Sequence, residues 1–580
     1  MDDELTNGGE NTKTANQAWR KRPRKFAPKS RLGCKTCKIR RVKCDQSRPS
    51  CLKCKSTGRI CDGYSEPEIP PAFKTELDGS RPYYKDMTNS TSTAYLPMHH
   101  HCDANRPSRL PMSQNLGPFM VLPVTGPAQE EAMSFFEYIS IKDLSGYHIG
   151  ESWPKTLMHF SQTVPSVRYA AVALALVHRD YLDRATTGRL NAPTDWLPGK
   201  APLLYYNRAI QLLLSQPTGA NSDTETTAIT LVVCYLFTCF DQLTGNYVQA
   251  MKHLRGGVEL LRSRDNYSVL NKNSTHNVAK TSGIDTLICQ VARQIRRLDM
   301  QAVLFLVDWT PANIQDTLMA QLPPPDIAFR SIEQAADHLQ VLVAQVMQLR
   351  NSLDQQMLPT SDEVPPQPSL NVNVVLEQLD QWSNLFDNMM LQRSSSHETD
   401  SETYRRLTSL LRLHHTVAWT YLSSSCGPGR EMEYDKFLPQ FQKCVGLARE
   451  VVAAAEHEVH RLGSLKPTFT PEIGILPALY IIGVKCRHPA VRREILSILR
   501  RQTVREAVWD STCTATVVER VIEIEESGRW EEGEGVVQDM QQIAVWQRIE
   551  TMSWVQSTGR VDIRYTFCTQ DGFHFESLEL

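Results

Sequence analysis

The sequence lacks the apolar segments that membrane insertion and export require. No window of the 580 residues reaches about 18 consecutive apolar residues, the length of a membrane-spanning helix. The nearest run, Ala228 to Phe240, is shorter and is followed directly by Asp241. The chain begins Met-Asp-Asp-Glu-Leu, without the apolar core of a secretory signal. We therefore expect no membrane association and no export, and we expect the 15 cysteines to be thiols or metal ligands rather than disulfides.

Sequence signatures of catalysis are also missing. There is no glycine-rich phosphate loop of the P-loop kind and no Gly-x-Ser-x-Gly nucleophile elbow. His457 and His460 are one residue too close for the i, i+4 pair of a zinc peptidase helix, so this segment is interpreted as an ordinary surface helix. The sequence therefore predicts no enzyme.

The charge of the chain is distributed very unevenly. Residues Arg20 to Cys61 contain 16 Lys or Arg and a single acid, Asp45, which gives +15 in 42 residues. The whole chain carries −1, so the other 538 residues sum to −16. A short basic head on an acidic body indicates a module that binds a polyanion.

Composition divides the chain into four predicted parts. Residues 65–127 hold 10 of the 33 prolines and show little periodicity, which is typical of an extended linker. From about Glu130 onward apolar residues recur at helical spacing, and strand-like alternation is scarce except at 561–575. The predicted parts are a disordered basic tail at 1–30, a cysteine-rich domain at 31–64, a disordered Pro/Ser/Thr-rich linker at 65–130, and an all-α domain at 131–580 with polar loops near 265–283, 351–372 and 393–403.

Six cysteines form two halves with the same C-x2-C-x6-C spacing, offset by 17 residues. Structural zinc takes four thiolates, so six thiolates fill one site with two left over, or two sites if two sulfurs bridge. The duplication favours two ions, with one bridging sulfur from each half; three disulfides are the alternative that the missing export signal disfavours. A segment of about 30 residues cannot build an apolar core, so metal binding must supply most of its folding free energy. The predicted metal ligands are Cys34, Cys37, Cys44, Cys51, Cys54 and Cys61.

This segment resembles the fungal Zn2Cys6 binuclear-cluster transcription regulators. The matching features are Gly33, the basic run Lys38 to Lys43, Arg48-Pro49 between the halves, and Gly63-Tyr64 after the last cysteine. The resemblance implies two Zn²⁺ ions in one binuclear cluster, with Cys34 and Cys51 as the bridging thiolates. It also implies that each half is a short helix followed by an extended strand.

The same resemblance implies how DNA is bound. The first helix of the family enters the major groove and reads a CGG triplet through a basic pair near its end, which here is Arg40 and Arg41. Arginine suits guanine because two N–H groups of its guanidinium can donate to O6 and N7 at the same time. Lys38 and Lys43 are expected to contact phosphates, which positions the module without specifying sequence. Neutralisation of phosphates is the alternative role for Arg40 and Arg41.

The body resembles the fungal-specific regulatory domain of this family more loosely. The resemblance implies an all-α domain that acts through self-association, transcriptional co-regulators or small-molecule sensing. Many family members dimerise through a coiled coil directly after the cluster, but Pro67, Pro70 and Pro71 would break a helix there. Any homodimer is therefore expected to form through the regulatory domain. The segments that carry the resemblance are 165–181, 205–213, 245–261, 485–496 and 506–510.

The sequence thus predicts a small zinc-stabilised Zn2Cys6 module plus a large all-α regulatory domain, joined by a Pro-rich linker. The predicted function is sequence-specific regulation of RNA polymerase II transcription, in the nucleus, through double-stranded DNA. The basic run Arg20 to Lys25 is interpreted as a nuclear-localisation signal or as an arm that adds non-specific DNA affinity. Two alternatives stay open: an enzyme-like or metabolite-sensing body localised to DNA by the zinc module, and a non-specific nucleic-acid binder driven by charge alone.

Overall fold

The computed structural model divides the chain into two compact units, Met1–Ala104 and Asn105–Leu580. The basic tail at 1–30 and most of the linker at 65–130 lie outside the described residues. The described residues are 34–40, 42, 44–45, 47, 50–61, 126–146, 152–186, 199–215, 223–272, 283–306, 309–311, 322, 328–356, 371–394, 402–424, 429–460, 467–527, 537–557, 559–570 and 572–580.

The first unit contains two short helices, α1 (Lys35–Ile39) and α2 (Leu52–Lys55). Its buried cluster consists of cysteines, with Cys61 packed against it half-buried. The apolar side chains Ile39, Leu52 and Ile60 are 79%, 62% and 87% exposed, so they do not contribute to a core. The described part of this unit thus has sulfur in the place of a hydrocarbon core, as expected of a segment that metal binding must fold.

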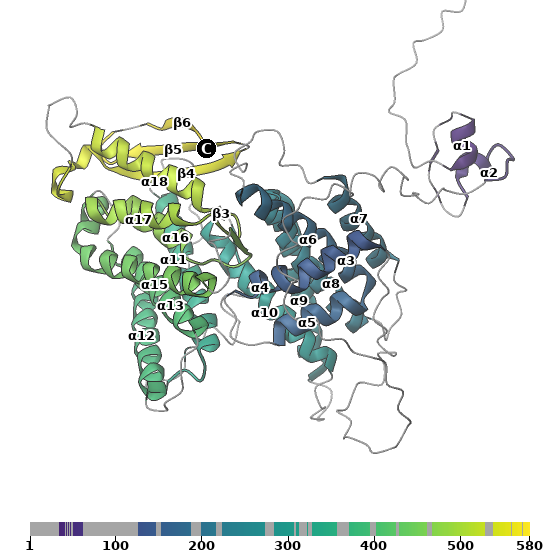
Figure 1. The fold of residues 1–580 in the computed structure, drawn as a ribbon, viewed down its shortest axis with the longest axis horizontal. Coiled ribbons are helices and arrows are strands. Elements are labelled where there is room, and N and C mark those ends of the chain that lie inside the picture. Colours follow the sequence, from purple (N-terminus) through teal and green to yellow (C-terminus); the bar gives the residue numbers. More distant parts are fainter. Residues whose placement is uncertain are drawn as a thin grey trace, which may run out of the picture. The chain divides into compact units, whose positions relative to one another are not determined.

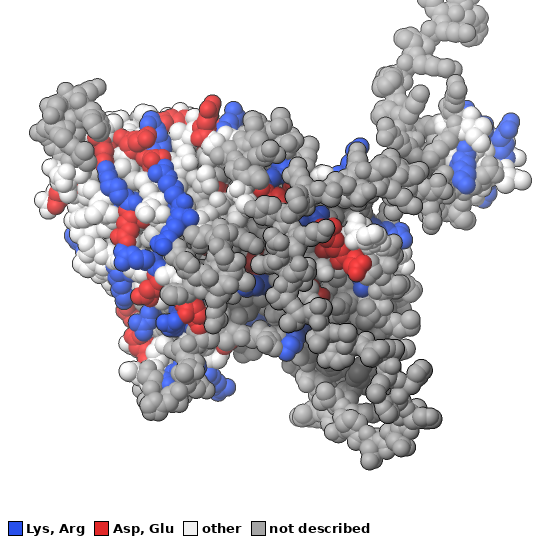
Figure 2. All heavy atoms as spheres, in the orientation of Figure 1, with Lys and Arg blue, Asp and Glu red and all other residues white. Residues whose placement is uncertain are grey.

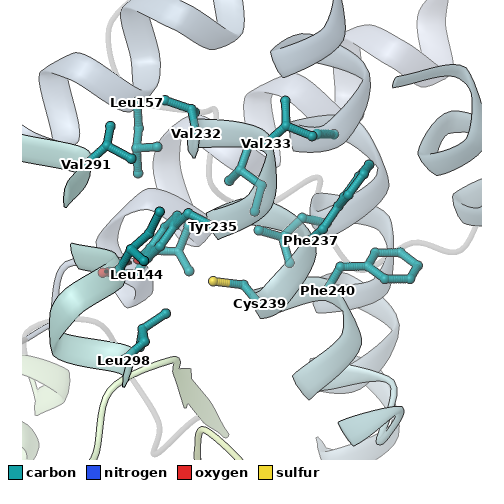
Figure 3. Close-up of a cluster of buried hydrophobic side chains, with 14 of the residues drawn as sticks. Leu144, Leu157, Val232, Val233, Tyr235, Phe237, Cys239, Phe240, Val291 and Leu298 are labelled. Atoms are coloured by element: carbon teal, nitrogen blue, oxygen red, sulfur yellow. Dashed lines mark hydrogen bonds between the residues drawn. The ribbon is translucent and has the colours of Figure 1, made fainter. Parts of the chain in front are cut away.

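The second unit begins with a helical bundle around α8 (Figure 1). Helix α8 is apolar enough over Thr224–Leu243 to cross a membrane by length and composition, but 78% of that window is buried inside the bundle. Figure 3 shows Cys239 among Leu144, Tyr235 and other apolar side chains, and this cysteine is fully buried in the core. The bundle comprises α3 (Pro127–Phe135), η3 (Phe136–Ser140), α4 (Ile141–Leu144), α5 (Ser152–Thr163), α6 (Pro165–Thr186), α7 (Lys200–Leu214), α8 (Asp223–Leu243), α9 (Tyr247–Lys272), α10 (Gly283–Gln301) and η4 (Ala302–Leu304).

A second group of helices forms a separate apolar cluster. Its centre is Trp382, which stacks on Phe386 and His415 and donates its indole N–H to the carbonyl oxygen of Ala335 at 2.9 Å. The helices are α11 (Ile332–Gln356), α12 (Val372–Ser394), α13 (Glu402–Ser423), α14 (Arg430–Glu433), η5 (Tyr434–Phe437), α15 (Leu438–His460), α16 (Leu476–Lys485), α17 (Pro489–Arg501) and α18 (Ser511–Glu526).

Polar contacts and a small sheet join the two helical groups. Strand β1 (Thr468–Thr470) pairs in parallel with β2 (Val504–Glu506), which pairs antiparallel with β3 (Trp509–Asp510). Phe469 of β1 belongs to the apolar cluster of the first group. Buried Arg505 of β2 donates to the carbonyl oxygen of Leu243 at 3.0 Å, at the end of α8. These contacts make the helices one unit although their cores are distinct.

The C-terminal residues add a sheet to the mostly helical body. Strands β4 (Ile549–Ser557), β5 (Arg560–Phe567) and β6 (His574–Glu579) pair antiparallel in that order. The inner face buries Val561 and Ile563 against α18 side chains such as Val517, as the period of two along β5 requires. The prediction of a large, mostly helical body is confirmed. Its last described α-helix ends at Glu526, short 3-10 turns follow at Met540–Gln542 and Val545–Gln547, and the alternation noted at 561–575 belongs to strands.

Two helices continue into segments that the sequence assigned to polar loops. Helix α9 runs to Lys272, into the loop expected near 265–283, and α11 runs to Gln356, into the loop expected near 351–372. Polar residues there do not end the helix, because most polar residue types have a helical propensity close to that of apolar ones.

Opposite charges alternate on the surface formed by α15, α17 and α18 (Figure 2). Arg449 of α15 pairs with Glu494 of α17, and Arg493 of α17 pairs with Glu526 of α18 at 2.7 Å. Arg500 and Glu519 form another α17–α18 pair. Glu519 and Glu526 of α18 therefore contribute to helix packing through these pairs.

Candidate metal centre and nucleic-acid interface

The sulfur atoms of the first unit converge from both halves of the duplicated motif. Cys34 Sγ lies 3.6 Å from Cys51 Sγ and 3.8 Å from Cys54 Sγ. Cys37 Sγ lies 3.6 Å and 3.8 Å from the same two atoms. All four sulfurs are within 4.8 Å of one another, and Cys44 Sγ is within 4.8 Å of Cys51 Sγ.

These distances fit zinc. A tetrahedral zinc site with Zn–S bonds of about 2.3 Å has S···S edges of about 3.8 Å. The four sulfur–sulfur distances of 3.6–3.8 Å match such an edge, and all four side chains are fully buried. Van der Waals contact between sulfurs alone does not require four of them to converge from two helices, so the arrangement indicates a shared cation.

The backbone repeats the duplication that the sequence shows. The Cys37 N–H donates to Cys34 Sγ at 3.3 Å, and the Cys54 N–H donates to Cys51 Sγ at 3.2 Å. The Cys34 N–H donates to Cys44 Sγ at 3.4 Å, as the Cys51 N–H does to Cys61 Sγ at 3.5 Å. N–H groups that donate to sulfur stabilise thiolates, so the same backbone contacts favour the thiolate form in each half.

Burial opposes the charge that metal binding requires. It raises the pKa of the Cys34 thiol to about 12 and raises the pKa of Cys51 further. These thiols would therefore remain protonated at neutral pH without a cation. Zinc must displace the protons, so affinity for the metal is expected to fall as the solution becomes more acidic.

Asp45, the single acid of the basic head, holds the two halves in register. Its carboxylate accepts the backbone N–H of Leu52 at 2.9 Å and that of Lys53 at 2.9 Å, at the start of α2. The Ser47 hydroxyl donates to it at 2.6 Å, and this bond, followed by the Lys53 N–H, lowers the pKa of Asp45. Sequence reasoning assigned Asp45 no role, although one acid among 16 basic residues is a signal of a structural partner.

Contacts outside the sulfur cluster also tie the halves together. Arg40 donates from Nη1 to Thr57 Oγ1 at 3.0 Å, and the Thr36 hydroxyl donates to the carbonyl oxygen of Ile60 at 3.2 Å. Arg40 lies directly after α1, as the sequence predicts. Of the other predicted DNA contacts, Arg41, Lys43 and the side chain of Lys38 lie outside the described residues.

The described surface of this unit is basic (Figure 2). Lys35, Lys53, Lys55 and Arg59 are exposed around the sulfur core. Because the cluster itself would carry +4 − 6 = −2 with two Zn²⁺ and six thiolates, part of this basic charge offsets the cluster, and the rest is available to phosphates.

A cavity in the body lies where α10, α11 and α13 meet. Its walls are mostly apolar, with Met300, Leu339 and Leu411 among them. The charged groups at its margin are paired, since Arg297 Nη2 lies 3.3 Å from Glu472 Oε2. Gln301, Gln340 and His414 are the other polar side chains that line it.

Comparison with known families covers both units. Residues 32–69 match the fungal Zn(2)-Cys(6) binuclear cluster domain, and residues 133–521 match the fungal specific transcription factor domain. The first match shows that the head is a module for two zinc ions in one cluster. The second match covers more than half of the chain.

Relatives agree with both matches. The chain is 23% identical over 566 residues to the aspercryptin biosynthesis cluster-specific transcription regulator of Emericella nidulans, covering 84% of this chain and 86% of the relative. It is 25% identical over 232 residues to a transcription regulator of Purpureocillium lilacinum, covering 39% of this chain and 47% of that protein. A Zn(2)-C6 fungal-type transcription factor of Aspergillus fumigatus is 38% identical over 89 residues, or 15% of this chain and 24% of that protein.

No solved structure matches the chain. The predicted family, the zinc cofactor and the general function are confirmed by the two family matches and the relatives. The chain belongs to the fungal Zn(2)-Cys(6) transcription regulators, and it is a sequence-specific transcription factor.

Proposed function

We propose that this regulator reads CGG-type triplets in the major groove through α1, with its six motif cysteines as the zinc ligands. The observation that carries the proposal is the convergence of four buried sulfurs at 3.6–3.8 Å. Cys34 and Cys51 would be the thiolates that both ions share, as the resemblance to the family implies, and their sulfurs lie 3.6 Å apart.

The base contacts are assigned to Arg40 and Arg41 and the phosphate contacts to Lys38 and Lys43. The Arg40 side chain already bonds Thr57, so it must exchange this bond for guanine or read DNA with its other donors. Arg41, the next residue of the basic pair, is assigned the main guanine contact. A fork of two parallel donors to O6 and N7 gives discrimination that a phosphate contact cannot give.

The body is proposed to regulate transcription and to recruit co-regulators, without catalysis of its own. The basic run Arg20 to Lys25 is proposed to direct the chain to the nucleus. Support comes from the relatives, which are named as transcription regulators.

Selection of binding sites from a random DNA duplex pool tests the proposal. The zinc-loaded full chain is used at physiological salt, with a chelator as control. Enrichment of CGG triplets that disappears with the chelator is the expected result. Binding that persists without zinc and enriches no sequence would contradict it, and would favour charge-driven binding by the basic head.

The target genes are proposed to form a biosynthetic gene cluster. The observation in favour is the chain-long similarity to a cluster-specific regulator, which includes the body as well as the zinc module. Deletion of the gene should lower or raise the transcripts of a contiguous set of genes. Scattered transcript changes with no contiguous set would contradict this assignment.

A further inference from the structure

The C-terminal sheet has one edge that faces the body and one that does not. At the β4 edge, the Lys485 ammonium donates to the carbonyl oxygen of Glu550 at 3.2 Å and Arg487 donates to that of Ile549 at 3.1 Å. Figure 1 shows β6 at the other margin of the sheet. Among the described strands, β6 pairs with β5 alone.

The direction of the β6 backbone groups follows from its pairing with β5. The Leu580 N–H donates to the carbonyl oxygen of Gly559 at 3.0 Å. Because backbone direction alternates along a strand, the even-numbered residues of β6 bond β5. Phe575, Ser577 and Glu579 therefore direct their N–H and C=O groups away from the sheet.

This edge has few of the features that prevent an edge strand from pairing with a strand of another chain. Residues 574–580 contain no lysine, no proline and no glycine, and the strand has no register shift against β5. The Phe575 side chain is 70% exposed. A regular edge with unpaired backbone donors and an exposed aromatic side chain is a template for another strand.

We propose that a second copy of this chain adds its own β6 antiparallel to this edge, about a two-fold axis at Ser577. In that register Ser577 faces Ser577 of the second copy, and Phe575 faces Glu579 of the second copy. All the pairs formed by these outward residues are hydrogen-bonded pairs. The two three-stranded sheets become one continuous sheet of six strands.

Charge favours this register over its neighbour. If the axis lay at Glu576 instead, Glu576 would face Glu576 of the second copy. Two like charges directly opposite each other are destabilising. Centring the axis on Ser577 places Glu579 opposite Phe575, and the Arg564 guanidinium lies 5.7 Å from the Phe575 ring and 3.6 Å from that of Phe573. Glu579 of one copy thus lies near the Arg564 guanidinium of the other copy.

A second copy also fits the symmetry of the contact. A two-fold axis needs only one strand that is complementary to itself, and most homo-oligomers close in this way. The inference concerns the body alone, so it does not depend on zinc or on the DNA contacts. It supplies a dimer contact to a chain whose prolines after the cluster disfavour a coiled coil.

Cysteine cross-linking tests the register in the full chain. In a hydrogen-bonded pair the two Cα atoms are about 5.5 Å apart, within the range of a disulfide. The Ser577→Cys variant should therefore give a disulfide-linked dimer, doubling the 65.8 kDa mass on a non-reducing gel under mild oxidation. Phe575→Cys is the matched control, because the two copies of residue 575 would be about 14 Å apart.

Equal cross-linking of the two variants would overturn the proposal, and so would cross-linking of Ser577→Cys no faster than that of the wild type. Sedimentation of the full chain gives an independent reading. Ser577→Pro removes an outward N–H and should shift the wild-type dimer to monomer, while Ser577→Ala should not. Matching thermal unfolding of these variants and the wild type excludes loss of the fold as the cause. A wild-type chain that sediments as a monomer at all concentrations would also overturn the proposal.

Discussion

Arg487 and Glu525 form a fully buried ion pair that joins the segment between α16 and α17 to the end of α18. Arg487 Nη2 lies 2.9 Å from Glu525 Oε1, and Arg487 Nε lies 3.3 Å from Glu525 Oε2. The pair continues to Glu431, 2.7 Å from Arg487 Nη1, and Glu525 also accepts the Ile549 N–H at 2.8 Å. It therefore fixes the first residue of the C-terminal sheet to the helical body.

Removal of one partner of this pair should strongly destabilise the body. Arg487→Met leaves Glu525 and Glu431 buried with less compensation, and we expect a loss of about 3–5 kcal/mol in the free energy of unfolding. The measurement is urea denaturation followed by circular dichroism. Arg500→Met breaks the exposed pair with Glu519 and should cost at most about 1 kcal/mol. Equal losses in both variants would contradict the assignment of the buried pair.

Acid should weaken the body through Glu525. Although burial opposes it, the guanidiniums of Arg487 and Arg492 lower the pKa of Glu525 to about 2. An acid with a lowered pKa in the folded state contributes stability above its unfolded pKa of about 4.3, and this contribution is lost as pH falls toward 2. Urea midpoints measured from pH 5 to pH 2 should fall more steeply for the wild type than for Glu525→Gln. Parallel curves would show that this group does not titrate as described.

Loss of one thiolate should unfold the head and leave the body intact. Cys34→Ser removes a sulfur that lies next to both Cys51 and Cys54, so we expect fewer than two zinc ions per chain and loss of DNA binding. Metal analysis and a mobility-shift assay measure these effects. Cys289→Ser, at an exposed cysteine of α10, should retain both properties. Zinc content unchanged in Cys34→Ser would exclude this sulfur as a ligand.

Asp45→Asn should weaken zinc retention without removing a ligand. The amide has a single acceptor oxygen and no charge, so it cannot replace the carboxylate at the N–H groups of Leu52 and Lys53. Competition with a chelator should release zinc at a lower chelator concentration than for the wild type. The matched control is Lys55→Gln, an exposed change on the same helix that should leave the release curve unchanged. Identical release from Asp45→Asn and the wild type would show that the Asp45 contacts to α2 do not support the cluster.

Arg41 and Lys43 should differ in how their loss affects DNA binding. Arg41→Lys removes the guanine fork and should cost about 1–3 kcal/mol on the selected sequence, with little effect on scrambled DNA. Lys43→Ala should weaken binding to both sequences and reduce the slope of log K against log salt by about 0.9. Titrations at several salt concentrations measure both effects. A uniform loss for Arg41→Lys would assign this residue to phosphate.

The sequence determined the metal centre to a large extent, because the ligand chemistry is local. The spacing from Cys34 to Cys61 is a property of consecutive residues, and so is the basic run around Arg40. The apolar stripe of α8 is equally local, which explains why a helical body with Cys239 in its core was predictable. Periodicity along a helix predicts which face is buried, even when the element that packs against that face is unknown.

Only the tertiary structure decided which charges pair and where the sheet ends. Arg548 reaches the Glu431 carbonyl oxygen across 117 positions at 3.0 Å, and no local pattern marks either residue as buried. The role of Asp45 likewise depends on the α2 backbone folding back onto it. Whether a charge is buried, and whether a strand is an edge, depends on which distant segments pack together; residue type and spacing alone do not carry that information.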